Sequence, residues 1–203
     1  MPCDEQPEVQ VTKVVFDVSM SLDGFITAAN MRADEPLGDG GERLHEWAFG
    51  GDERSMELLA EAGKEIGAVM CGRNTYDHSV PWWGADGPTG PARMSVFVVT
   101  HSEPEEQPEN GVYRFMTNGI EAALGQAKET ARDKTVGVMG GADLGRQCIR
   151  AGLVDEISIH LVPVLFGSCM QMFDDAEHVH IKLEPIAVEN TPSAAHMRFR
   201  VVK

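Results

Sequence analysis

Two short apolar segments each end on glycine and lead into a helix-forming segment, and this repeated arrangement constrains the fold most. Residues 66–71 lead into Gly72-Arg73-Asn74-Thr75, and residues 135–139 lead into Gly140-Gly141 before a helical pattern over 142–151. A strand, a glycine turn and a helix in succession are typical of α/β sheets, which bind ligands at the carboxyl ends of their strands. Glycine lets the backbone approach a phosphate, and free helix N–H groups point at it. The two turns therefore predict a dinucleotide site.

Apolar periodicity divides the rest of the chain into further strands and helices. Alternation and short apolar runs predict strands over 13–21, 94–100, 112–115, 156–162, 178–189 and 195–202. Amphipathic spacing predicts a helix over 120–131, and another over 52–61 with Asp52 as its N-cap and Gly63 past its end. Loops are expected at 27–51, with a short helical turn at 43–49, and at 81–91.

These elements indicate one α/β domain over residues 11–203, preceded by a flexible acidic tail at residues 1–10. Strands and helices alternate through the first three-quarters of the chain, whereas the last three strands follow one another without helices. The expected architecture is therefore a mixed, mostly parallel central sheet with an antiparallel C-terminal edge.

An excess of acidic residues limits the classes of partner. The formal net charge is −15, so the phosphates of a nucleic acid would be repelled over the whole surface. No apolar run approaches the roughly 18–20 residues of a membrane span, and the acidic start has no apolar signal segment, so a cytoplasmic location is expected. The cysteines form no CxxC pair and no grouping has metal-ligand spacing, so no metal site is expected. Cys71 and Cys148 are interpreted as small buried residues.

A phosphate-bearing cofactor would need local help against this negative charge. Arg73 and Thr75 place a guanidinium and a hydroxyl beside the first glycine turn, although a solvated surface arginine is an alternative interpretation. Thr100-His101-Ser102 ends the next predicted strand, where it could bind the adenosine ribose and its 2′-phosphate. An ordinary turn would have the same sequence, so both interpretations stay open.

Motifs in a fixed order give the chain a resemblance to a known family. They are Ser19-Met20-Ser21-Leu22-Asp23-Gly24, Gly72-Arg73-Asn74-Thr75-Tyr76, Thr100-His101, Met139-Gly140-Gly141-Ala142, Gly152-Leu153-Val154-Asp155-Glu156 and Pro163-Val164-Leu165-Phe166-Gly167. Over residues 13–202 this set resembles the dihydrofolate-reductase-like superfamily, in the branch of the C-terminal reductase domain of bacterial riboflavin biosynthesis. The resemblance implies a mixed sheet of about eight strands flanked by helices. It also implies NADPH across the carboxyl edge of that sheet, and a homodimer.

The resemblance assigns roles to individual residues. The implied cofactor-binding positions are Ser21, Gly72, Arg73, Asn74, Thr75, Thr100, His101, Ser102, Gly140, Gly141, Ala142, Asp143, Leu144 and Gly167. Arg73 and Thr75 would contact the cofactor phosphates, and residues 140–142 would contact the pyrophosphate. Thr100 and His101 would lie at the adenosine ribose. Ser21 and Asp23 would face the nicotinamide and the substrate, with Gly167 near the nicotinamide end.

The substrate side departs from dihydrofolate reductases, which hold a carboxylate in the helix before the Gly-Arg turn. The inward position here is expected to be Met56, with Leu59 on the same face, which argues against dihydrofolate reduction. A hydride acceptor also needs a proton, and the catalytic candidates for its donor are Asp23, His45 and Glu46. Asp23 could instead stabilise the turn before Gly24, and the other two could belong to a polar helix face.

Two classes of function remain. The first is an NADPH-dependent reductase that transfers a hydride to a C=N or C=O bond of a small heterocyclic substrate, with a pteridine or a ribosylaminopyrimidine as candidates. The second is a protein of the same fold that binds NADPH or another ligand without turnover, as a sensor or scaffold.

Overall fold

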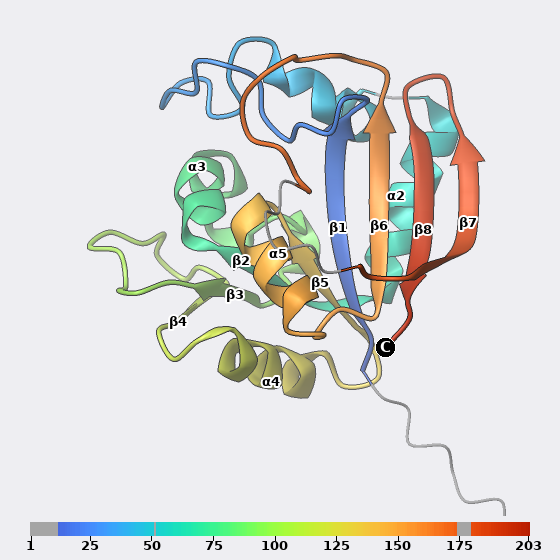
Figure 1. Cartoon of the computed structure of the whole chain (residues 1–203). Helices are drawn as coiled ribbons and strands as arrows, with labels where there is room; N and C mark the ends of the chain where they lie inside the picture. Colours follow the sequence, from blue (N-terminus) through green and yellow to red (C-terminus); the bar gives the residue numbers. More distant parts are fainter. Residues whose placement is uncertain (1–11, 51, 174–179) are drawn as a thin grey trace, which may run out of the picture.

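The computed structural model describes residues 12–50, 52–173 and 180–203, which build one mixed β-sheet with helices on both faces (Figure 1). Within these residues the sheet has eight strands in the order β4-β3-β2-β5-β1-β6-β8-β7. They are β1 (Val14–Ser21), β2 (Ile66–Gly72), β3 (Val96–Val99), β4 (Tyr113–Met116), β5 (Thr135–Met139), β6 (Glu156–Val162), β7 (Leu183–Asn190) and β8 (Ala195–Val201). Strands β1 to β6 run parallel, while β8 pairs antiparallel with both β6 and β7.

The helices cover the two faces of the sheet. Helices α4 (Ile120–Ala131) and α5 (Ala142–Arg150) pack on one face, and α2 (Glu53–Glu65) and α3 (Arg73–Trp83) lie on the other. In Figure 1 α5 stands in front of the sheet and α2 stands behind it. The connection between β1 and α2 holds the 3-10 helix η1 (Gly41–His45) and the one-turn helix α1 (Glu46–Phe49), and the short 3-10 helices η2 (Gly84–Asp86) and η3 (Gly90–Ala92) follow α3.

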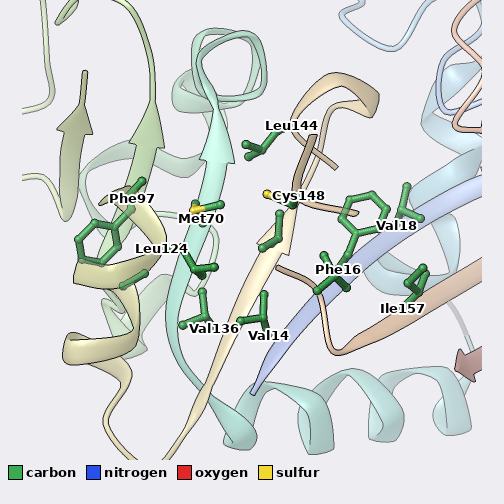
Figure 2. Packing of buried hydrophobic residues seen from close by; sticks show 14 of the residues in the cluster. Val14, Phe16, Val18, Met70, Phe97, Leu124, Val136, Leu144, Cys148 and Ile157 are labelled. Atoms are coloured by element: carbon green, nitrogen blue, oxygen red, sulfur yellow. The ribbon is translucent and has the colours of Figure 1, made fainter. Parts of the chain in front are cut away.

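The main core lies between the sheet and the pair α4 and α5 (Figure 2). Side chains alternate along a strand, so Val14, Phe16 and Val18 of β1 all point into this core. Their alternate neighbours, Asp17 and Ser19, point to the opposite face, on the side of α1 and α2. One face of β1 is therefore apolar and the other carries the polar groups that matter for the site.

The predicted fold class is confirmed, and three local predictions are wrong. Helix α2 continues through Gly63 to Glu65, because a glycine in an exposed helix costs only about 1 kcal/mol. Pro81 lies in the last turn of α3 rather than in a loop, and the helix ends at Trp83, before Gly84 with its positive φ of 53°. Strand β7 begins at Leu183, not at residue 178. The predicted tail at 1–10 and positions 178–179 lie outside the described residues.

Strands β1 and β6 extend past their neighbours at the carboxyl edge. Strand β5 pairs with β1 only from Val14 to Asp17, where Asp17 lies opposite Met139, the last residue of β5. Strand β6 accompanies β1 onward to Ser21. The last four residues of β1 therefore form a step beside the end of β5, with β6 behind it.

Candidate functional site

Strands β2 and β5, which are neighbours in the sheet, end side by side at its carboxyl edge, and we call the region between the two turns that follow them the crevice. The chain leaves β2 into α3 on one face and leaves β5 into α5 on the other face. Neighbouring strands whose helices depart to opposite faces mark the usual ligand site of an open α/β sheet. The two glycine turns found in the sequence are therefore side by side at this point, as the sequence predicts.

Thr75 and Gly140 hold the two turns in contact. The backbone N–H of Gly141 donates to Thr75 Oγ1 at 3.1 Å. Gly140 has a φ of +78°, and a Cβ at this position would lie 2.3 Å from Thr75 Cγ2. Only glycine gives both the backbone conformation and the close approach. Because of this contact, the first turn of α3 and the first turn of α5 open into the same crevice.

Arg73 joins this crevice to the end of β3. Its Nε donates to both carboxylate oxygens of Asp77 at 2.7 and 2.9 Å, and its Nη1 donates to the carbonyl of Ser102 at 2.8 Å. The hydroxyl of Thr100 donates to the same carbonyl at 2.8 Å. The structure thus brings together Arg73, Thr100 and Ser102 from the predicted cofactor set, with His101 exposed in the same turn.

The other predicted cofactor positions divide into exposed and buried ones. Asn74 and Asp143 are exposed, and Asp143 accepts a hydrogen bond from Gln147 Nε2 at 3.0 Å. The side chains of Ala142 and Leu144 are buried in the main core, at 2% and 5% exposure. Those two residues can therefore offer a ligand only their backbone groups.

Ser21, Asp23 and Gly167 form one turn structure at the end of β1. Ser21 Oγ donates to Asp23 Oδ1 at 2.6 Å, and the N–H groups of Gly167 and Phe166 donate to the same carboxylate at 2.7 and 3.2 Å. The Ser21 hydroxyl, followed by these two N–H groups, holds the pKa of Asp23 below its ordinary value. An ionised acceptor with these partners favours the interpretation of Asp23 as a turn-stabilising residue over that of a proton donor.

His45 and Glu46 lie at the junction of η1 and α1 but differ in surroundings. Glu46 is exposed. Burial is the main cause that lowers the pKa of His45, opposed by the negative charge of Asp17 and reinforced by His160. Of these two predicted catalytic residues, only His45 therefore interacts electrostatically with the interior polar groups described next.

A chain of polar side chains crosses from β1 to α2 on this face of the sheet. His160 Nε2 lies 3.1 Å from Asp17 Oδ2, and His160 Nδ1 lies 2.7 Å from His196 Nδ1. His196 Nε2 lies 3.3 Å from Ser55 Oγ, which donates to Asp52 Oδ2 at 2.9 Å. We call these five residues the polar chain. Sequence reasoning missed them as site residues, apart from Asp52 as a helix cap.

Trp47 covers the middle of the polar chain. Its ring stacks on His160 with 3.9 Å between centroids and meets His196 edge-on at 5.0 Å. Its indole N–H donates to Ser19 Oγ at 3.0 Å, and the residue is only 4% exposed. The tryptophan therefore fixes both imidazole rings and keeps that side of them dry.

Asp17 is the end of the polar chain that solvent can reach. The side chain of Asp17 is 45% exposed to solvent, whereas that of His160 is 11% exposed. Burial is the largest single influence on the pKa of Asp17 and raises it, but the charge and hydrogen bond of His160, with a hydrogen bond from Ser158, outweigh it and lower the pKa. Asp17 is thus partly desolvated by surrounding protein and still reached by solvent, at the position opposite the end of β5.

Helix α2 presents Ser55 to the sheet, and the prediction of Met56 as the inward position is wrong. Ser55 is fully buried, whereas Met56 and Leu59 are 44% and 40% exposed. Asp52 caps the helix as predicted, accepting from Ser55 N at 3.0 Å and from Ser193 Oγ at 2.6 Å. These bonds fix the rotation of the helix about its axis. The carboxylate on this side of the site therefore comes from β1 and not from α2.

Two kinds of feature are absent from the part of the chain that the structure describes. Among residues 12–50, 52–173 and 180–203, no group of three or more His, Cys, Asp or Glu side chains is placed to hold a metal ion. Across the same residues, every helix is too short or too polar to span a bilayer.

Solved structures share this fold at low sequence identity. A protein assigned to riboflavin biosynthesis from Shewanella sp. PV-4 superposes with a TM-score of 0.71 and 18% identity, over 95% of this chain and 100% of that one. The diaminohydroxyphosphoribosylaminopyrimidine deaminase/5-amino-6-(5-phosphoribosylamino)uracil reductase of Thermotoga maritima gives 0.66 and 16%, over 95% of this chain and 57% of that one. Dihydrofolate reductase from Enterococcus faecalis, complexed with NADP(H), gives 0.57 and 14%, over 94% and 97%.

The family is settled by the sequence match to a protein-family description rather than by these superpositions. Residues 12–197 match the RibD C-terminal domain, which includes every strand of the sheet up to the middle of β8. The predicted resemblance is confirmed. The chain belongs to the RibD C-terminal domain family and has its dihydrofolate-reductase-like fold.

Proposed function

We propose that the protein is an NADPH-dependent reductase that transfers a hydride to a C=N or C=O bond of a small heterocyclic substrate. The observation that carries the proposal is the pairing of two open helix starts across one crevice. Neither α3 nor α5 has a side-chain cap at its N-terminus, and Thr75 holds the two turns together. Uncapped helix N-termini with glycine turns suit the phosphates of a dinucleotide.

The residues around the crevice fit the two ends of this cofactor. Strands β3, β2, β5 and β1 are successive neighbours, so Thr100, Gly72, Gly140 and Ser21 end up in a row along the carboxyl edge. Arg73 offers a cation at the β3 end of the row, where a 2′-phosphate would distinguish NADPH from NADH. The row supports placement of the pyrophosphate at the Gly140 turn and of the nicotinamide toward the end of β1.

The cofactor supplies the hydride when it is bound, and the chain has to bind and orient the reactants. The Asp23 carboxylate holds the turn at the end of β1, which would form the wall of the nicotinamide end. Burial and the charges of Asp17 and His160 act on the pKa of His45, while Glu46 remains on the surface. We therefore rank His45 above Glu46 and Asp23 among the predicted catalytic residues.

The substrate proposal stays within small polar heterocycles. The structurally similar protein from Thermotoga maritima is named as a ribosylaminopyrimidine reductase, and the one from Enterococcus faecalis is named as a dihydrofolate reductase. In this chain helix α2 offers no inward carboxylate, which counts against a dihydrofolate substrate held in that manner. A ribosylaminopyrimidine-type substrate is therefore the first class to test.

We also propose that two copies associate, through the part of the sheet that no helix covers. In Figure 1 no helix stands in front of β6, β8 and β7, whereas α5 stands before the part of the sheet to the left of β1. Phe199 and Val201 on this face are only partly buried, and Val188 of β7 is 61% exposed. Burying such a face against a second copy would remove apolar surface from water.

Titration with NADPH and NADH tests the cofactor. Thr75→Val removes the hydroxyl that accepts from Gly141, and we expect NADPH affinity to fall about 5- to 10-fold for the loss of one hydrogen bond. Thr89→Val is the matched control, because Thr89 Oγ1 likewise accepts from a backbone N–H, that of Met94, away from the crevice. Equal effects of the two variants, or no binding of either nucleotide, would contradict the proposal.

Turnover is then measured as the loss of dihydronicotinamide absorbance. The two probes are 5-amino-6-(5-phosphoribosylamino)uracil and dihydrofolate. Oxidation of NADPH with either probe supports the reductase. Tight NADPH binding without oxidation by any C=N or C=O acceptor would instead favour the binding protein without turnover.

A further inference from the structure

We propose that Asp17, His160 and His196 form a proton relay at the substrate end of the crevice, which donates the proton that accompanies hydride transfer. This inference rests on the proposed reductase function and extends it to residues that no sequence motif indicated. It makes Asp17 the group that touches the substrate, and His160 and His196 positioning residues that hold the proton behind it.

The proposal rests first on the position of Asp17 in the sheet. Asp17 lies directly opposite Met139, and Gly140 is the next residue along. Neighbouring strands lie about 4.8 Å apart, so the Asp17 carboxylate is one strand away from the turn proposed to hold the pyrophosphate. Its side chain is 45% exposed, at the last β1 position that pairs with β5, next to the step. A substrate resting against the end of β5 would therefore meet this carboxylate.

The proposal rests secondly on the directions of the hydrogen bonds in the polar chain. The contact of 2.7 Å between the two Nδ1 atoms requires one ring to donate and the other to accept. With one extra proton on the imidazole pair, every donor is used: His160 donates to Asp17 and to His196, and His196 donates to Ser55. Ser55 then donates to Asp52.

Without that proton the direction of the chain reverses. His160 still donates from Nε2 to Asp17, but its Nδ1 now accepts from His196, whose Nε2 accepts from the hydroxyl of Ser55. Asp52 keeps its bonds from Ser55 N and from Ser193 Oγ. Both arrangements are fully hydrogen-bonded with the same heavy atoms, so one proton can enter or leave with little rearrangement.

The charged groups around the imidazole pair come from several elements. Asp17 of β1 and Asp52 at the start of α2 lie at its two ends, and Glu189 of β7 acts on His196 from a distance. His45 of η1 acts in the opposite sense as a further imidazole. Burial lowers the pKa of His196, with His160 second, and the negative charges of Asp52, Glu189 and Asp17 oppose that shift.

With NADPH bound, every proton and electron of the reduction is accounted for. The substrate C=N or C=O carbon gains a hydride from the dihydronicotinamide, which becomes oxidised, and the substrate nitrogen or oxygen gains a proton through the Asp17 carboxylate. His160 passes its Nε2 proton to Asp17 as it does so. The pair then holds two protons, on His160 Nδ1 and His196 Nε2, and His160 Nε2 regains a proton from water by way of the solvent-accessible Asp17 carboxylate.

Histidine NMR tests the relay without requiring turnover. The side-chain titrations of His160 and His196 are followed in the free protein, with NADPH, and with NADP⁺, whose oxidised ring carries one more positive charge. If the relay lies beside the nicotinamide end, the apparent pKa of the pair should be lower with NADP⁺ than with NADPH by about 0.5–2 units. Asp17→Asn should lower it in the free protein by a similar amount.

The matched control is Glu156→Gln, which removes a buried carboxylate from the same sheet face at the opposite end of β6. It should fold, as judged by its thermal transition, and leave the histidine difference between NADPH and NADP⁺ in place. With either probe that is turned over, Asp17→Asn should lower kcat by about 10²–10⁴-fold without changing NADPH affinity, and Asp17→Glu should recover part of it.

The two proposals fail in different ways. Absence of binding by either nucleotide overturns the reductase proposal and the relay with it. Binding of both nucleotides with identical histidine titrations, or an Asp17→Asn variant that keeps full kcat, overturns the relay alone and leaves Asp17 and the histidines as a structural cluster.

Discussion

Replacing Gly140 by alanine tests whether the crevice is built on a close backbone approach. A Cβ at Gly140 would lie 2.3 Å from Thr75 Cγ2, 2.5 Å from Thr75 Oγ1 and 2.9 Å from Thr75 Cβ. Backbone φ at this position is +78°, in the left-handed region that L residues avoid. The substitution therefore meets two separate obstacles, one in the backbone and one in space.

The two costs can be added. A left-handed conformation costs an L residue about 1–2 kcal/mol. Overpacking a close contact adds about 1–3 kcal/mol. Gly140→Ala should therefore lower the free energy of unfolding by about 2–5 kcal/mol, a large part of the 5–15 kcal/mol that is typical of a whole domain.

Urea denaturation measures the loss, and Gly152→Ala is the matched control. Gly152 also has a positive φ, of +66°, but a Cβ there would have no atom within 4 Å, so it should show only the backbone cost. Thr75→Ser removes the nearest atom and keeps the hydroxyl that accepts from Gly141, so it should recover part of the Gly140→Ala loss. Equal losses for the two glycine variants, together with no recovery by Thr75→Ser, would refute the reasoning.

Four further outcomes are expected. Arg73→Ala should weaken NADPH by about 10- to 100-fold in a binding titration and NADH less, whereas equal losses would place Arg73 at the shared pyrophosphate. Hydrogen bonds from Ser193 and Ser55 lower the pKa of Asp52 below 3.8, so the stability advantage of wild type over Asp52→Asn should be full above about pH 4 and vanish as pH falls further, in thermal scans. Burial lowers the pKa of His196, so stability should decline as pH falls below about 6.5, and His196→Gln should flatten that slope. Val188→Glu should leave the fold intact and shift sedimentation toward a single copy; an unchanged sedimentation profile would count against the proposed interface.

The fold was predictable because its elements are strongly periodic and its turns carry glycine. Strands β5 and β6 and helix α4 match their predicted bounds, and the glycine turns come together as expected. The errors occur where tertiary contacts override local preference. Gly63 and Pro81 both lie inside helices whose remaining contacts compensate for a weak residue.

The polar chain was not predictable by the same means. Its central residues, Asp17, His160 and His196, are far apart in the sequence and meet only because β1, β6 and β8 are adjacent. The sequence motifs that indicated a site lie in loops and at helix ends instead. One signal was present: Asp17 interrupts an apolar strand on the same face as Ser19, which the alternation of side chains would have shown.

The contact between Thr75 and Gly140 also has a consequence for the divergence of related sequences. The two positions share one small volume across the crevice, so neither can change size alone without separating the two turns. A lineage that acquires a side chain at position 140 should carry a smaller residue at position 75, and the two changes should be inherited together. Paired variation at these two columns would then mark relatives whose crevice has been rebuilt for a different ligand.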